Sequence, residues 1–131
     1  MKTSTLIFYW CVRILAALIM LQTLRFKFSG AEESVYIFST VGMEPWGRIF
    51  VGVLELLAAI LIMLNATVWI GAALSAGLMA GAIGMHLTIL GISVKGDGGY
   101  LFFLALLVFA CSVIILRFNK SKIMALIKAL K

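Results

Sequence analysis

Four polar side chains interrupt the long apolar runs of this sequence, and each is of a type that can bind a ligand or move a proton. They are Arg13, Gln22, Glu55 and His86. A charge at the centre of a bilayer costs about 2.5 to 3.5 kcal/mol on insertion scales, so each of these residues needs a structural or functional reason. A carboxylate and an imidazole in a low dielectric can bind a polar headgroup, such as a quinone carbonyl, or relay a proton. We interpret the four as candidate ligand-binding residues and assign no catalytic role.

The amino-acid composition predicts the type of structural element that carries these residues. The chain has 131 residues, of which 64% are hydrophobic and 12% charged, whereas a soluble domain has roughly 45 to 50% and about 25%. Four helical crossings of about 20 residues each would use roughly 80 residues, close to the apolar count. A soluble globule and a disordered chain are excluded by this excess, and a disulfide scaffold by the presence of only two cysteines. The sequence predicts an all-α integral membrane protein with a single membrane domain over residues 1–131.

The apolar runs and the residues that bound them predict a four-transmembrane-helix bundle. Ser34–Val41 is apolar but too short to span, and Glu32 and Glu33 suit the positive end of a helix, so a short interfacial helix is expected there. Pro45 then opens the second crossing, where its missing N–H costs nothing. The expected spans are 5–24, 46–64, 68–92 and 99–116, with the interfacial helix at about 33–42 and a basic amphipathic C-terminal tail at 117–131.

Basic residues after the last apolar run predict the orientation. They are Arg117, Lys120, Lys122, Lys128 and Lys131. Lys and Arg favour the cytoplasmic side and contact anionic lipid headgroups. An even number of crossings returns the N-terminus to the same side, so both termini are expected to be cytoplasmic in a bacterial-type inner membrane. Membrane lipids are therefore the expected partners of this charge, and nucleic acid is not, because no nucleic-acid-binding fold is present.

The polar residues are expected to meet inside the bundle. At 1.5 Å per residue, Arg13 and Glu55 both fall about 12 to 14 Å deep, which predicts an ion pair near the midplane. His86 and Gln22 would lie nearer the outer surface, within reach of a neighbouring glutamate. The cluster is either purely structural or a pocket for a polar headgroup. One His and one Glu do not make a metal site, which needs three or four ligands, so no metal is predicted.

The third crossing carries two stripes of small residues at four-residue spacing. One is Ala73, Gly77 and Gly81, and the other is Ala72, Ala76, Ala80 and Gly84. Such stripes let helices approach closely, so we expect packing within the bundle or, alternatively, a homo-oligomer contact.

The two cysteines, Cys11 and Cys111, fall at similar depth in the first and fourth crossings. Without a C-x-x-C pair they are typical of packing residues, although their redox activity stays open.

Several short motifs together resemble the DoxX and DoxX-like small membrane proteins. They are an Arg in the first crossing followed by Lys27-Phe28-Ser29-Gly30, a Val-Gly-Met-x-Pro segment ending at Pro45, Gly-x-x-Glu-Leu-Leu at 52–57, and Met-His-Leu at 85–87. The resemblance implies a four-helix membrane bundle. It also implies a link to thiosulfate:quinone oxidoreductases and to membrane complexes that handle oxidative and thiol stress, while distant relatives look like assembly chaperones or cargo receptors.

We therefore expect an accessory or subunit of a quinone-linked membrane redox system, with a redox partner protein and a polar pocket that holds a quinone-like or lipid molecule. Two alternatives stay open. One is a non-enzymatic interaction protein, such as an assembly factor or chaperone. The other is a small-solute or proton pathway, which the wholly apolar stretch between Glu55 and Leu64 disfavours.

Overall fold

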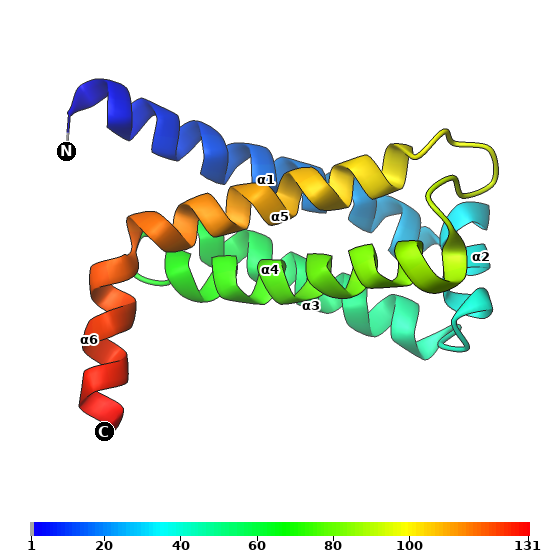
Figure 1. Cartoon of the computed structure of the whole chain (residues 1–131). Helices are drawn as coiled ribbons and strands as arrows, with labels where there is room; N and C mark the ends of the chain where they lie inside the picture. Colours follow the sequence, from blue (N-terminus) through cyan, green and yellow to red (C-terminus); the bar gives the residue numbers. More distant parts are fainter. Residues whose placement is uncertain (1) are drawn as a thin grey trace.

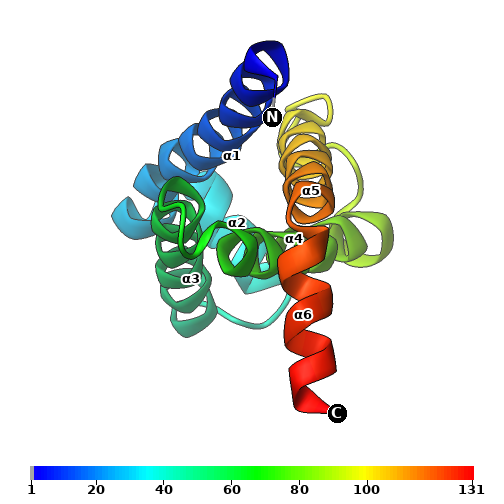
Figure 2. The same ribbon diagram turned by 90° about the vertical axis from the view of Figure 1, so that its left-hand side faces the viewer.

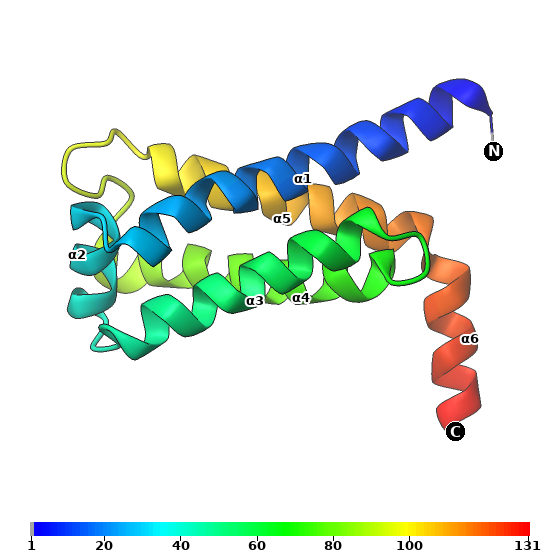
Figure 3. The same cartoon turned by 180° about the vertical axis from the view of Figure 1, so that it is seen from behind.

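The computed structural model describes residues 2–131 and is built from helices (Figure 1). In chain order they are α1 (Thr3–Ser29), α2 (Glu32–Thr40), α3 (Trp46–Met63), α4 (Val68–Met85), the π-helical turn η1 (His86–Leu90), α5 (Tyr100–Phe118) and α6 (Lys120–Leu130). Helices α1, α3, α4 and α5 lie side by side as a bundle, with α2 across one end (Figures 1 and 3). Helix α6 turns away from the bundle at the other end.

Four helices within residues 2–131 are long and apolar enough to cross a membrane: Thr3–Ser29, Trp46–Met63, Val68–Leu90 and Tyr100–Phe118. The predicted four-helix membrane bundle is thereby confirmed. Large apolar side chains point outward, for example Leu18 at 60% and Leu87 at 63% exposed. Such a surface would drive aggregation in water but suits contact with lipid. Both termini lie at the same end of the bundle (Figure 1).

Helix α1 is longer than predicted, because it ends at Ser29 and not at Leu24. Gly30 has φ +69°, and the Ala31 N–H donates to the Phe26 carbonyl, which is the pattern of a glycine-terminated helix. No residue between Leu24 and Gly30 breaks the helix. The extension keeps Lys27 on the helix and so brings it to the bundle interior.

The bundle core is built from small residues where the helices touch. Ala16, Ala58 and Ala72 are fully buried, so neighbouring backbones approach closely. Gly71 is the closest case, because a Cβ added there would lie 2.7 Å from the Ile62 amide nitrogen and 2.8 Å from the Ala58 carbonyl oxygen. Helices α3 and α4, which are joined by a tight link, therefore form a hairpin in which the two backbones are in close contact at Gly71.

The small-residue stripes of α4 were expected to pack inside the bundle, but much of their length faces outward. Ala73, Gly77 and Gly81 are exposed, and a Cβ at Gly77 or Gly81 would meet nothing within 4 Å. Packing within the bundle is therefore the wrong interpretation for this stripe. The second stripe starts buried at Ala72 and ends exposed at Gly84, because a four-residue step advances about 40° beyond a full turn. Self-association through this face stays a prediction.

The Gly71 contact gives a test of the packing. Gly71→Ala is expected to destabilise the protein by about 1 to 3 kcal/mol, since the new methyl group meets backbone that cannot rotate away. Gly77→Ala, on the same helix but facing outward, is the matched control and should be neutral or slightly stabilising. Thermal unfolding in detergent measures both. Equal loss in the two variants would contradict the close approach of α3 and α4.

Candidate functional site

A cavity of about 440 Å³ lies inside the bundle, in the half covered by α2. Helices α1 to α5 and η1 all contribute to its wall, which is mostly apolar. Its polar side chains include Thr23, Lys27, Glu55, His86, Asp97 and Tyr100. A mostly apolar cavity with a few converging polar groups is the usual form of a small-molecule site, and its volume falls within the common range of roughly 300 to 1,000 Å³.

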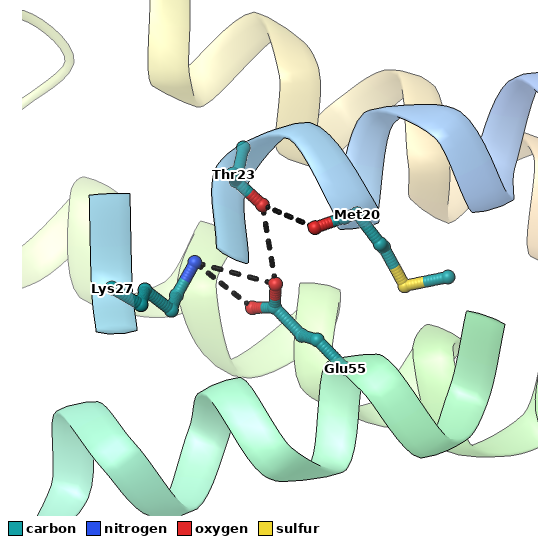
Figure 4. Close-up of polar contacts among 4 residues, drawn as sticks. All are labelled: Met20, Thr23, Lys27 and Glu55. Carbon is teal, nitrogen blue, oxygen red and sulfur yellow. Dashed lines mark hydrogen bonds and ion pairs between the residues drawn. The ribbon is translucent and has the colours of Figure 1, made fainter. Parts of the chain in front are cut away.

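Glu55 is the buried carboxylate of this cavity, and α1 supplies its partners (Figure 4). The Lys27 ammonium lies 3.1 Å from one carboxylate oxygen and 3.3 Å from the other. The Thr23 hydroxyl lies 3.2 Å from the second oxygen and 2.9 Å from the Met20 carbonyl. Because a hydroxyl has one hydrogen, Thr23 donates fully to only one of these acceptors at a time. Thr23 and Lys27 are four residues apart, so they share one face of α1.

Gly52 sets how closely α3 approaches α1 beside Glu55. A Cβ at Gly52 would lie 2.7 Å from the Phe28 ring. Arg48, one turn earlier, pairs with Glu44 at 3.0 Å and donates to the Lys27 carbonyl. These contacts fix the end of α1 that carries Lys27.

His86 enters the cavity wall from the π-helical turn η1 and is 5% exposed. Its Nδ1 lies 3.0 Å from the Gly91 carbonyl oxygen. A carbonyl only accepts, so Nδ1 carries the hydrogen, and Nε2 can accept a hydrogen bond when the ring is neutral. No partner for Nε2 is present in the described chain, and the ring is held edge-on against Phe102 at 5.5 Å. One nitrogen of His86 is therefore held by Gly91, while the other has no hydrogen-bond partner among the described residues.

Asp97 organises the loop between η1 and α5. Its carboxylate accepts from the backbone N–H groups of Val94, Gly99 and Leu101 at 2.9, 2.8 and 3.3 Å. Burial raises the pKa of Asp97, but these three hydrogen bonds outweigh it, so the pKa lies below its usual value. The bonds to Gly99 and Leu101 also hold the start of α5.

The predicted ion pair between Arg13 and Glu55 is wrong. Arg13 is buried at the opposite end of α3, where Nε donates to the Ile62 carbonyl at 2.9 Å and Nη1 to the Asn65 side chain at 2.9 Å. Its guanidinium stacks 3.8 Å over the Trp10 ring, and Nη2 has no partner among the described residues. The carbonyls at a helix C-terminus are partly negative, so they attract this cation. Glu55 instead pairs with Lys27, which the prediction had placed beyond the end of the helix.

Gln22 is also misplaced by the prediction. It is exposed on the outside of α1 and does not line the cavity, whereas its neighbour Thr23 does. Successive helical residues point about 100° apart, so the two cannot face the same way. Of the four predicted residues, Glu55 and His86 share the cavity. Thr23, Lys27 and Asp97 were missed, although the i, i+4 spacing of Thr23 and Lys27 was a readable signal.

The two cysteines do not form a pair. Both are free, with Cys11 exposed on the outside of α1 and Cys111 buried in the core of α5. The cavity wall contains neither of them.

A double-mutant cycle tests the Glu55 pairing. Lys27→Met and Glu55→Leu should each destabilise the bundle, and their combination should show a coupling of about 0.5 to 3 kcal/mol because they contact each other. Arg13→Leu is the control, since Arg13 binds Ile62, roughly 10 Å further along α3. Its effect should add to that of Glu55→Leu within about 0.5 kcal/mol. Coupling of Glu55 to Arg13 and not to Lys27 would refute the assignment.

The depressed pKa of Asp97 predicts a pH dependence. Its contribution to stability should be complete above about pH 3.9, the usual aspartate value, and should be lost as the pH falls through the lower native-state pKa. Asp97→Asn removes this titration. The difference in unfolding midpoint between wild type and Asp97→Asn should therefore be constant near neutral pH and shrink in acid. A difference that does not change with pH would exclude a titrating Asp97.

Comparison with known proteins gives one result. No curated protein and no solved structure matches the chain. The sequence model of the DoxX family matches residues 9–91, which run from α1 to the end of η1 and include Lys27, Glu55 and His86. This match covers more than half of the chain and agrees with the four membrane-spanning helices described above. The chain is therefore a small multi-pass membrane protein that belongs to the DoxX family.

Proposed function

We propose that this protein holds a quinone-like molecule in its cavity and acts as an accessory subunit of a membrane redox system. The observation that carries the proposal is the cavity of about 440 Å³, in which Lys27, Glu55 and His86 are polar residues of a mostly apolar wall. A ring with polar substituents and an apolar tail suits such a wall. The family match supports a small membrane protein and leaves the ligand to be identified.

The hydrogen-bonding groups suit both forms of a quinone. A quinone carbonyl needs a donor, and the Lys27 ammonium has three hydrogens, of which Glu55 takes at most two. A quinol hydroxyl needs an acceptor, which Nε2 of neutral His86 provides. When bound, a quinone supplies the electron chemistry. The residues of this chain would orient the ring and exchange protons with it, and a partner protein would exchange the electrons.

Orientation and localisation form part of the same proposal. Lys2 and the basic residues of α6 lie at one end of the bundle. At the other end, four basic residues are balanced by four acidic ones: Arg25, Lys27, Arg48 and Lys95 with Glu32, Glu33, Glu44 and Asp97. The positive-inside rule favours a cytoplasmic location for both termini in a bacterial-type inner membrane. The cavity then lies in the outer half of the bilayer.

Native mass spectrometry of the purified protein, with extraction of lipids and quinones, tests the ligand. A quinone should copurify with wild type and should be lost or strongly reduced in Glu55→Gln and in His86→Ala. Gln22→Ala is the matched control, because Gln22 is on α1 but outside the cavity, and it should retain the ligand.

Two outcomes would overturn the proposal. One is an intact protein without quinone in all four forms, which would favour the alternative of a non-enzymatic interaction protein whose polar cluster is structural. The other is equal retention in wild type and both cavity variants, which would place the ligand elsewhere.

A further inference from the structure

The C-terminal helix α6 leaves the bundle in a direction that the structure fixes. Asn119, between α5 and α6, is buried, and its side-chain amide donates to the Tyr9 hydroxyl at 2.9 Å and to the Ile115 carbonyl at 2.8 Å. Both amide hydrogens are thus used. The Phe118 ring also packs against Tyr9, with 4.9 Å between ring centroids. The bend between α5 and α6 is therefore anchored to α1.

Helix α6 runs across the direction of the bundle helices at the end that holds both termini (Figures 1 and 2). If the bundle spans the bilayer, α6 lies along the membrane surface. None of its residues is buried, and Met124, Ile127 and Leu130 are 45%, 43% and 79% exposed. At 100° per residue its large apolar side chains share one face, with Lys122 and Lys128 at the two borders of that face. Lys120 and Lys131 lie on the same face, one at each end of the α6 segment. This pattern is typical of a helix at the lipid–water interface.

An open groove, of about 340 Å³, lies at the bend between α5 and α6. It is lined by Val113, Leu116, Arg117, Lys120, Ile123 and Met124. Two cations therefore lie beside four apolar side chains. Val113 is 46% exposed on the outward surface of α5, so the apolar part of the groove continues into the surface that faces lipid chains.

We propose that the groove between α5 and α6, the elbow groove, binds an anionic phospholipid. The phosphate lies between Arg117 and Lys120, and an acyl chain follows Val113 and Leu116 along α5. Charge complementarity favours this occupant, because none of the five acidic residues of the sequence belongs to α5 or α6. An acidic protein would match the charges but not the apolar strip that runs toward the middle of the membrane.

The test is a lipid titration of the full-length protein in detergent, followed by native mass spectrometry. The two lipids are phosphatidylglycerol and phosphatidylcholine with the same acyl chains. Wild type should prefer phosphatidylglycerol, and each of Arg117→Gln and Lys120→Gln should weaken its binding about fivefold. The double variant Arg25→Gln/Lys95→Gln removes the same charge from the opposite end of the bundle and should retain the preference.

Two results would overturn the proposal: an unchanged preference in Arg117→Gln/Lys120→Gln, or an equal loss in the Arg25→Gln/Lys95→Gln control. The second would indicate attraction by net charge alone.

Spin labels give an independent measurement in phosphatidylglycerol vesicles, in a Cys11→Ser background. A label at Ile127→Cys on the apolar face should be accessible to oxygen dissolved in lipid. A label at Ala125→Cys, on the opposite face, should be accessible to a water-soluble relaxant. Equal access of both labels to the water-soluble relaxant would show α6 away from the membrane and contradict the site.

Discussion

A charge placed inside a lipid-facing bundle must find its partner within the protein, and this constraint shapes both halves of the structure. Arg13 donates to the Ile62 carbonyl near the end of α3 and to the Asn65 side chain, and Glu55 contacts Lys27 and Thr23. Removing one member of such a contact leaves an uncompensated buried charge, which costs far more than the contact contributes. The two contacts therefore fix how α1 lies along α3, one near the middle of the shorter helix and one near its C-terminus.

The bundle has two chemically different halves, one at the end that holds the termini and one at the end covered by α2. Toward the termini, α1, α3, α4 and α5 meet through buried apolar residues such as Ala16, Ile62 and Ile115. Toward α2, the lining of the larger cavity replaces this packing, and Thr23, Lys27, Glu55 and His86 are among its polar side chains. Glu55 lies at the boundary between the halves. Its carboxylate is neutralised by a neighbour and is still part of the cavity wall, so structural and ligand-binding roles are combined in one residue.

Much of the fold could be predicted from the sequence, because membrane helices are governed by the length of their apolar runs. The four spans apart from the end of α1, the short helix after Gly30 and the start of α3 after Pro45 follow from local signals. The site was predicted less well, since it depends on rotation about helix axes. Glu55 and His86 were found, whereas Arg13 was paired with the wrong residue and Gln22 was chosen in place of Thr23. Lys27 was missed because a charged residue near a predicted helix end was assigned to the loop.

Helix α1 has 27 residues and α3 has 18, so their lengths are roughly 40 and 27 Å at 1.5 Å per residue. The hydrocarbon core of a bilayer is roughly 30 Å thick, and a helix longer than this tilts or extends beyond it. Because α1 carries Lys27 near one end and Tyr9 near the other, its tilt affects both the cavity and the bend before α6. A change in bilayer thickness that alters the tilt of α1 would therefore affect the cavity and the bend before α6 together.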